Sequence, residues 1–376
     1  MIALRSVAIA LSLALSGCGV FGIGGGDAPK PTPLTEIKST VTPRAAWTAS
    51  VGKSQGFHFA PELEGGRIYA AAADGTITIL DEDTGRLHAR FDAKKKLSGG
   101  IAVEDSKILV GTLKGDVLAF DPAGKPVWTS NVAGEVIAPA SISKKVAVIR
   151  TADGRIFGLS LDDGKRKWVY QRPMPSLLLR TDVGAQALGS DVVAGYPGGK
   201  LIALDLEDGK LTWEVTVSLP RGATELERIA DVAGVPVMDG ARVCAAAFQG
   251  KVACFEIQTR NMVWSRDIWS SKGLAVDGKN IYIADDNGNV HALDKGTGAS
   301  VWKQDKLAYR RLSAPVIVNG LLVVGDGMGY LHVLSPEDGR FVGRLATDGS
   351  PIHALVPVPA GLVVQTAGGS IVSVRL

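Results

Sequence analysis

The sequence predicts an all-β chain, an eight-bladed β-propeller of four-stranded antiparallel blades whose ring is closed by an N-terminal strand. Three observations lead to this prediction. A repeat recurs eight times, glycine turns separate alternating apolar strands, and tryptophans recur about once per repeat. The 376-residue chain holds 46 glycines, while aromatic residues make up only 6%. Repetition at a period of roughly 40 residues is typical of propellers, in which each repeat forms one blade.

Each copy of the repeat has the same succession of strands and turns. In DGTITILDEDTGRLH, from Asp74, and NGNVHALDKGTGASVW, from Asn287, a two-residue turn leads into an alternating strand. A second glycine turn leads into a third strand, and a short apolar segment lies upstream. Glycine supplies the positive φ that such turns require. Four antiparallel strands per copy predict one blade.

The third strand of five successive copies ends in a tryptophan, and the separations are 40, 45, 51 and 38 residues. The pattern LDxxTGxxxW resembles the tryptophan-docking motif of pyrroloquinoline-quinone (PQQ)-type propellers, which implies that each indole packs between adjacent blades. The last copy stops at Leu376 without a third strand, so a strand around Trp47 is expected to complete it. Ring closure of this kind removes exposed sheet edges. The tryptophans predicted to be structural are Trp128, Trp168, Trp213, Trp264 and Trp302.

The N-terminus predicts an export signal over residues 1–17. Its apolar core, from Val7 to Leu15, is too short for a membrane-spanning helix, which needs about 20 residues. The sequence Leu-Ser-Gly-Cys ending at Cys18 resembles a bacterial lipobox, which implies acylation of Cys18. An ordinary secretory signal is the alternative. Gly19 follows, and by the sorting pattern of enteric lipoproteins the absence of Asp there favours the outer membrane.

The segment after the lipobox predicts a flexible tether. Residues 18–43 are rich in Gly, Pro and Thr, which is linker composition rather than core composition. The propeller is therefore expected to cover residues 44–376. The formal charge of +3 implies no basic face, so no nucleic-acid partner is expected.

Patterns for catalysis or metal binding are missing from the sequence. The five histidines are scattered and form no zinc pattern, and no Gly-x-Ser-x-Gly elbow occurs. The acidic runs at residues 81–83 and 285–286 fall at repeat turns, where Asp is expected for backbone reasons. Quinoprotein dehydrogenases resemble the chain in blade pattern only, and the adjacent cysteines that many of them carry are absent. We therefore predict no enzyme activity, no catalytic residue, no metal and no cofactor.

Two further cysteines flank one hairpin turn in the fifth copy of the repeat. By comparison with the next copy, Cys244 and Cys254 occupy positions that face each other across two strands. A cross-strand disulfide is one reading, because the exported chain would meet an oxidising compartment. Two small buried thiols are the other reading.

The repeat is lengthened at two adjacent places, after Trp168 and after Trp213. Insertions in repeat proteins map to loops that often form the binding face. The first insertion contains MPSLLLRTD, residues 174–182, and the second spans residues 218–236. Exposed leucines beside an arginine would suit the centre of a protein interface. The alternative is that the leucines belong to the innermost strand of the fourth blade.

Taken together, these features resemble the BamB family, the lipoprotein subunit of the machinery that assembles β-barrels in the Gram-negative outer membrane (BAM). The family's binding motif, an apolar–x–Leu–Arg stretch, corresponds here to Leu177, Leu179 and Arg180. An Asp-Val-Asp stretch one blade later corresponds to Asp231, Val232 and Ala233, so the second acid is missing.

The resemblance implies a non-enzymatic scaffold at the periplasmic face of the outer membrane. Its main partner would be BamA, bound through the polypeptide-transport-associated (POTRA) domains. Unfolded outer-membrane protein precursors would be further partners, and the lipid on Cys18 would hold the chain to the membrane. Two alternatives remain at this stage: a PQQ-dependent periplasmic dehydrogenase, and a periplasmic propeller that binds another protein.

Overall fold

The glycine turns of the repeat form tight hairpins. In the first blade, Gly75 links β3 (Arg67–Ala71) to β4 (Thr76–Asp81) at a φ of 109°, and a Cβ there would lie 2.7 Å from the carbonyl oxygen of Lys95. The computed structural model describes residues 29–180 and 182–376. Every regular element in these ranges is a β-strand, and no helix there is long and apolar enough to cross a membrane.

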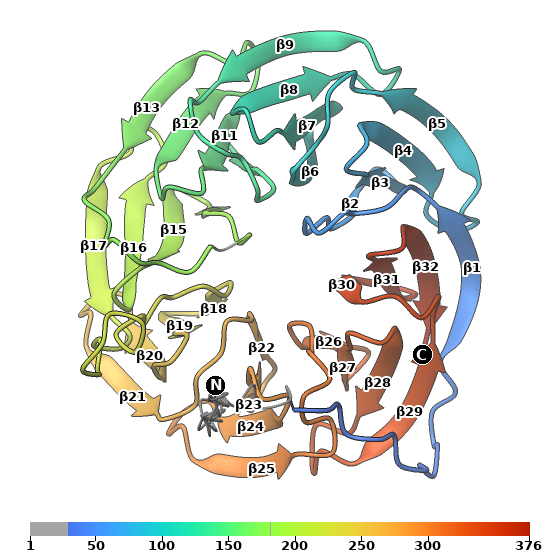
Figure 1. Ribbon diagram of the computed structural model, residues 1–376, viewed down its shortest axis with the longest axis vertical. Helices are drawn as coiled ribbons and strands as arrows, with labels where there is room; N and C mark the ends of the chain where they lie inside the picture. Colours follow the sequence, from blue (N-terminus) through green and yellow to red (C-terminus); the bar gives the residue numbers. More distant parts are fainter. Residues whose placement is uncertain (1–28, 181) are drawn as a thin grey trace, which may run out of the picture. The chain divides into compact units, whose positions relative to one another are not determined.

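The strands form eight four-stranded antiparallel sheets. Figure 1 shows these sheets arranged in a closed ring around a common centre. This arrangement confirms the predicted eight-bladed propeller. From the centre of the ring outward, the first blade contains β2 (Glu62–Glu64), β3 (Arg67–Ala71), β4 (Thr76–Asp81) and β5 (Leu87–Asp92), and the second contains β6 (Gly99–Glu104), β7 (Lys107–Gly111), β8 (Asp116–Phe120) and β9 (Pro126–Asn131). In the same order, the third contains β10 (Ser141–Ser143), β11 (Val146–Arg150), β12 (Ile156–Ser160) and β13 (Arg166–Tyr170), and the fourth contains β14 (Gln186–Leu188), β15 (Asp191–Tyr196), β16 (Lys200–Asp205) and β17 (Leu211–Thr216). The fifth blade contains β18 (Val237–Asp239), β19 (Arg242–Ala246), β20 (Val252–Glu256) and β21 (Met262–Arg266), and the sixth contains β22 (Leu274–Val276), β23 (Asn280–Ala284), β24 (Val290–Asp294) and β25 (Ser300–Gln304). The seventh contains β26 (Val316–Val318), β27 (Leu321–Gly325), β28 (Tyr330–Leu334) and β29 (Phe341–Ala346), and the eighth contains β30 (Ile352–Val358), β31 (Gly361–Thr366), β32 (Ser370–Arg375) and β1 (Arg44–Ser50).

The N-terminal strand β1 completes the eighth blade. It pairs antiparallel with β32, and Trp47 lies opposite Ser373. The last sheet therefore has the order β1-β32-β31-β30, which joins the two ends of the propeller. This confirms the predicted closure by a strand around Trp47.

The core lies between neighbouring blades. The two middle strands of each blade are buried along nearly their whole length, because both of their faces are covered by adjacent sheets. In β3, for example, four of the five residues are buried. Outer strands are far more exposed: in β9 only Trp128 is buried. One apolar cluster, for example, joins Val148 of the third blade to Val192 and Ile202 of the fourth. Face-to-face packing of this kind explains the continuous apolar runs in the repeat.

Tryptophans of the outer strands dock on the turn of the next blade. The indole N–H of Trp168 donates to the carbonyl oxygen of Leu206 at 2.8 Å, and a Cβ on Gly209 would lie 2.5 Å from the ring. Trp47, Trp128, Trp264 and Trp302 make the same type of hydrogen bond. Trp213 differs: the turn it packs against carries Arg260, at a φ of 62°, where the other turns carry glycine. The Thr-Gly pair of the repeat is thus explained by the flat ring that covers it.

The predicted tether is too long at its C-terminal end. Residues 31–43, called the strap below, do not behave as a free linker but lie along the seventh blade. The N–H of Thr32 donates to the Ala308 carbonyl at 3.0 Å, and Arg310 donates to the Thr32 carbonyl at 3.0 Å. Ile37 packs into the apolar cluster that contains Trp302 and Phe341. The predicted signal peptide and Cys18 lie outside the described residues.

The strap also takes the place of a missing tryptophan. In the seventh blade, Gly343 occupies the register position that Trp302 holds in the sixth. A Cβ on Gly343 would lie 2.9 Å from both the Pro43 ring and the Val41 carbonyl oxygen. The amides of Thr40 and Val41 both donate to the Val342 carbonyl at 2.9 Å. A Gly/Pro-rich composition could not distinguish this docked segment from a free linker.

Candidate functional site

The two lengthened connections lie side by side on one face of the ring. The first joins β13 to β14, and the second joins β17 to β18, so each runs from the outer strand of one blade to the inner strand of the next. Both therefore leave their blades at the same end. The stretch Leu177–Arg180 is not part of a strand, which excludes the alternative that it forms the innermost strand of the fourth blade.

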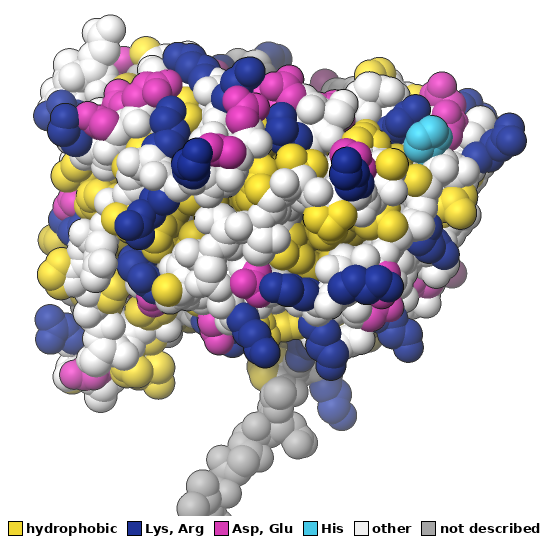
Figure 2. Space-filling view, turned by 90° about the horizontal axis from the view of Figure 1, so that it is seen from above, with side chains coloured by type: hydrophobic (Ala, Val, Ile, Leu, Met, Phe, Trp, Pro, Cys, Tyr) yellow, Lys and Arg dark blue, Asp and Glu magenta, His cyan; other side chains and the backbone are white. Residues whose placement is uncertain are grey.

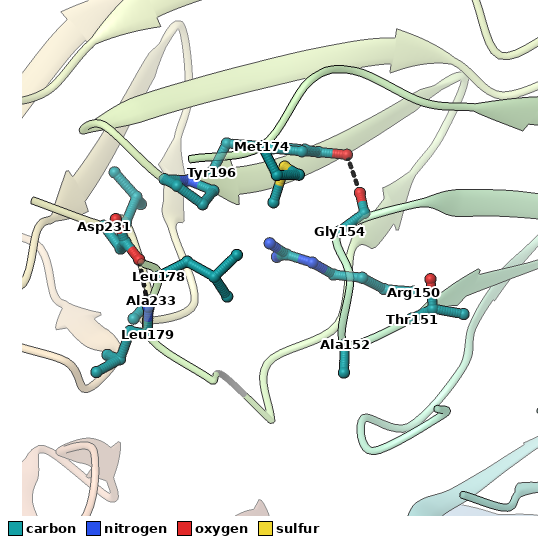
Figure 3. A pocket seen from close by; sticks show the side chains of 12 residues that line it. Arg150, Thr151, Ala152, Gly154, Met174, Leu178, Leu179, Tyr196, Asp231 and Ala233 are labelled. Carbon is teal, nitrogen blue, oxygen red and sulfur yellow. Dashed lines mark hydrogen bonds between the residues drawn. The ribbon is translucent and has the colours of Figure 1, made fainter. Parts of the chain in front are cut away.

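The three leucines of the first connection differ in exposure. Leu177 is 46% exposed, whereas Leu178 and Leu179 are partly buried. Leu178 points inward toward Arg150 and Met174 (Figure 3) and covers a small hollow beneath the connection. Leu179 lines the same hollow, so Leu178 and Leu179 anchor the connection, whereas Leu177 and Arg180 on either side are exposed.

Asp231 is buried rather than presented to a partner. Its side chain comes from the second connection, the residue is only 4% exposed, and its carboxylate accepts the backbone N–H of Leu179 at 2.6 Å. The other carboxylate oxygen accepts the N–H of Gly198 at 3.2 Å. The prediction that Asp231 contacts a partner is therefore corrected: the side chain positions the first connection from below. The alignment of motifs identified the residue but not the direction of its carboxylate.

A buried arginine adds charge beneath the same connection. Arg150 is 6% exposed, and its guanidinium lies 5.2 Å from the ring centre of Tyr196. Burial raises the pKa of Asp231, while the N–H donors of Leu179 and Gly198 and the positive charge of Arg150 oppose that rise. Burial likewise lowers the pKa of Arg150. The two opposite charges stabilise each other under the leucines.

Arg180 lies at the edge of this surface and is available to a partner. It is 57% exposed, and its Nη2 lies 2.7 Å from Oε2 of Glu135, which is 47% exposed. An exposed ion pair of this kind contributes about 0–1 kcal/mol, so exchange of Glu135 for a partner's carboxylate would cost little.

The second connection presents an apolar residue that the motif did not identify. Leu226 is 65% exposed at the tip of a turn held by reciprocal hydrogen bonds between Thr224 and Glu227. The Thr-x-x-Glu spacing was visible in the sequence as a capping box, which is the signal that could have located this turn. Ser176 donates to Glu225 at 3.3 Å and joins the two connections.

Leu177, Leu179, Arg180 and Leu226 together form what we call the loop surface. A hollow of about 230 Å³ lies between the two connections and is lined by Leu177, Pro220 and Ile229 among others. Ala233, where the family motif would carry a second acid, is 3% exposed. Its side chain carries no charge and lines a hollow that Leu179 and Arg180 also border.

Other predicted residues lie away from the loop surface. Cys244 and Cys254 face each other on β19 and β20 and are joined by a disulfide. The tryptophans lie on outer strands. Within residues 29–180 and 182–376, no group of three or more His, Cys, Asp or Glu side chains is placed to hold a metal ion. What the arrangement can do is bind a protein: apolar side chains and a cation stand on a rigid base.

Comparisons with known proteins identify the family of the chain. The family described as outer membrane protein assembly factor BamB matches residues 73–304. The BamB of Nitrosomonas eutropha is 40% identical over 99% of this chain and 95% of its own length. The BamB of Bordetella pertussis is 39% identical over 96% of this chain and 94% of its own length.

Solved structures separate the family from its enzymatic look-alikes. The crystal structure of BamB from Moraxella catarrhalis superimposes with a TM-score of 0.83 at 25% identity, covering 89% of this chain and all of that one. Quinohemoprotein alcohol dehydrogenase from Comamonas testosteroni reaches a TM-score of 0.68 at 13% identity, covering 90% of this chain and 78% of the enzyme. The second likeness shows the propeller fold alone.

Proposed function

The chain belongs to the BamB family of outer membrane protein assembly factors, and from this premise we propose that it is a non-enzymatic scaffold of the BAM complex. In this role the loop surface docks on the periplasmic POTRA domains of BamA and positions them for incoming barrel precursors. The observation that carries the proposal is the hydrogen bond between Asp231 and Leu179, because it holds the stretch that carries the exposed Leu177 and Arg180 in one conformation. Preorganisation of this kind lowers the entropic cost of binding.

The residues of the loop surface fit the composition of a protein interface. Leucine side chains contribute about 1.5–3 kcal/mol each when a partner buries them fully, and arginine is common among the residues that dominate binding. Arg180 would exchange Glu135 for an acid of the partner.

Attachment to the membrane is part of the same proposal. Acylation of Cys18 would anchor the chain to the outer membrane, facing the periplasm. A Cys18→Ser variant should leave the membrane fraction on cell fractionation. Retention of that variant in the membrane would mean that protein contacts, not lipid, hold it there.

Handling of unfolded precursors has support on the rim of the ring. The outer strands β5, β9 and β13 expose Leu87, Val127 and Val169 at 44–58% of their surface. Figure 2 shows hydrophobic side chains gathered across the middle of one side of the ring, between rows of charged residues. An edge strand with apolar side chains is suited to pairing with an extended peptide.

Binding of BamA by point variants tests the proposal. The full-length chain, its Leu177→Ala, Arg180→Ala and Leu226→Ala variants, and a Leu211→Ala control would be compared for affinity to BamA. Leu211 is 48% exposed on β17, outside the loop surface. Loss of an interface anchor costs about 2 kcal/mol, roughly thirtyfold in affinity, whereas the control should bind as the wild type does.

Each outcome of that comparison has a distinct meaning. A loss of affinity for BamA in the loop-surface variants, but not in the Leu211→Ala control, supports the proposal. Equal binding by all variants would remove the interface from the loop surface. No binding by the wild type would favour another protein partner, and a bound quinone detected by absorption would revive the dehydrogenase alternative.

A further inference from the structure

The mouth of the central channel lies next to the loop surface and forms a large cavity. It holds about 610 Å³ and is lined mostly by the connections that join one blade to the next, so it opens on the same face as the loop surface. Its charged and titratable lining residues are His58, Asp182, Lys272, Arg311 and His353.

A second hollow links this cavity to the loop surface. It holds about 370 Å³, shares His58, Asp182 and Lys272 with the channel mouth, and extends to Leu179 and Arg180. A segment of a partner that contacts Arg180 could therefore continue into the channel without crossing a ridge of side chains.

Two cations in the channel mouth have no counter-ion in the described parts of the chain. Neither Lys272 nor Arg311 lies within 4.0 Å of a carboxylate there, although the same ranges contain 19 ion pairs. The backbone holds Lys272 in place: its N–H donates to Ser270 Oγ at 2.9 Å, and its carbonyl oxygen packs so closely on Gly234 that a Cβ there would clash with it. The cation is thus fixed at its base and free at its tip.

The acids near the mouth already have partners. Asp182 lies 3.3 Å from Nδ1 of His58, and Glu135 pairs with Arg180. Asp286 accepts both the N–H and the hydroxyl of Ser271. None of these carboxylates lies within 4.0 Å of Lys272 or Arg311, although the charge of Lys272 acts on Asp286 from farther away.

The two histidines of the mouth add no positive charge at neutral pH. The rings of His58 and His353 stack with their centres 5.3 Å apart. Burial lowers the pKa of both, and the positive charge of Lys272 lowers each further. At pH 7 the positive charge of the mouth therefore comes from Lys272 and Arg311, while Asp182 keeps its negative charge beside the neutral His58.

We propose that the channel mouth receives an acidic segment of the polypeptide that docks on the loop surface, with its Asp or Glu side chains paired to Lys272 and Arg311. The inference rests on the proposed function and specifies the chemistry of the partner. Apolar lining residues such as Ala185, Val235 and Leu312 fit a peptide with carbon-rich side chains between its acids. A small inorganic anion would leave this apolar surface uncovered. The protein walls of the cavity have a low dielectric constant and focus the field of the two cations, so opposite charges attract more strongly there than at an open surface.

Charge reversal tests this inference. Full-length Lys272→Glu and Arg311→Glu would be compared with wild type for affinity to BamA at low and at high salt. Lys303→Glu is the matched control, because Lys303 is exposed on the outer strand β25, away from the channel. At low salt, we expect the affinity of each channel variant for BamA to fall at least tenfold, and at high salt we expect a smaller fall. The affinity of the control should change less than threefold.

A zero-length carbodiimide cross-link provides the second measurement, because it joins a lysine amine only to a carboxylate in contact with it. Mass spectrometry should find Lys272 joined to an Asp or Glu of the docked partner. If the wild type binds but Lys272→Glu behaves as Lys303→Glu does, and Lys272 forms no cross-link, the inference fails while the proposed function stands. Loss of wild-type binding would instead reject the proposed function itself.

Discussion

The carboxylate of Asp231 accepts a 2.6 Å hydrogen bond from the backbone N–H of Leu179, a residue 52 positions earlier in the chain. This contact ties the connection into the fifth blade to the connection into the fourth. It converts two neighbouring loops into one surface, because movement of either loop would leave a buried carboxylate or a buried N–H without its partner.

Removal of the Asp231 carboxylate should therefore affect both stability and binding. Asp231→Ala leaves the N–H groups of Leu179 and Gly198 without an acceptor, so we expect the free energy of unfolding to fall by about 1–3 kcal/mol. Affinity for BamA should fall as well, although the carboxylate does not face a partner. Urea denaturation and binding measurements check this. Asp208→Ala, at an exposed turn of the fourth blade, is the control. Unchanged binding by a folded Asp231→Ala would show that the hydrogen bond between Asp231 and Leu179 is not needed for binding.

Tryptophan docking can be separated from backbone strain with two glycine variants. Gly209→Ala introduces a Cβ that would lie 2.5 Å from the Trp168 ring, at a φ of 70°. Gly240→Ala introduces the same strain at a φ of 58° with open space around the Cβ. We expect about 1–2 kcal/mol of destabilisation at Gly240 and about 1–3 kcal/mol more at Gly209. Equal losses in urea denaturation would mean that the indole contact adds nothing.

The disulfide between Cys244 and Cys254 should stabilise the fifth blade. It closes a loop with a sequence separation of 10, for which chain entropy predicts a contribution of about 2–3 kcal/mol. Reductant should lower the free energy of unfolding of the wild type by that amount and so lower its unfolding midpoint. The Cys244→Ala/Cys254→Ala variant serves as control, since reductant should not change its midpoint. A wild-type midpoint insensitive to full reduction would contradict the expectation.

Release of the strap should be visible by proteolysis. Ile37→Asp places a charge in the cluster with Trp302 and Phe341, so the strap should open more often and trypsin should cut after Lys38 at least about tenfold faster. Glu36→Ala changes an exposed neighbour and should be cut at the wild-type rate. Mass spectrometry of timed digests measures both. Cleavage at one rate in all three proteins would mean that Ile37 does not hold the strap.

Stability should fall on mild acidification because of a histidine in the channel mouth. Burial is the main cause that lowers the pKa of His353, from 6.5 to about 4. The unfolded chain then binds the proton first, so stabilisation is complete above about pH 6.5 and is lost as the pH falls toward 4. The slope contributed is up to about 1.4 kcal/mol per pH unit. His353→Gln should flatten the pH dependence of urea denaturation over this window, whereas His88→Gln, exposed on β5, should leave it as in the wild type.

Much of the fold could be predicted because the features that define the repeat involve residues close together in the sequence. Glycine at the turns, alternation along the strands and the spacing of Trp168, Trp213 and Trp264 each act within a single blade. The closing strand at Trp47 followed from the incomplete last copy. The leucine–arginine stretch could be located for a similar reason, since an insertion stands out against a regular period.

The sequence by itself determined the blades, their number and the position of the two long connections, because these depend on contacts between residues close together in the chain. Only the tertiary structure decided that Asp231 turns inward, that the strap lies on the seventh blade, and that Lys272 and Arg311 meet in one channel mouth. The Arg310–Thr32 hydrogen bond spans 278 residues. Such contacts form only when ring closure brings distant blades together, and no local pattern of residues encodes the direction in which a side chain then points.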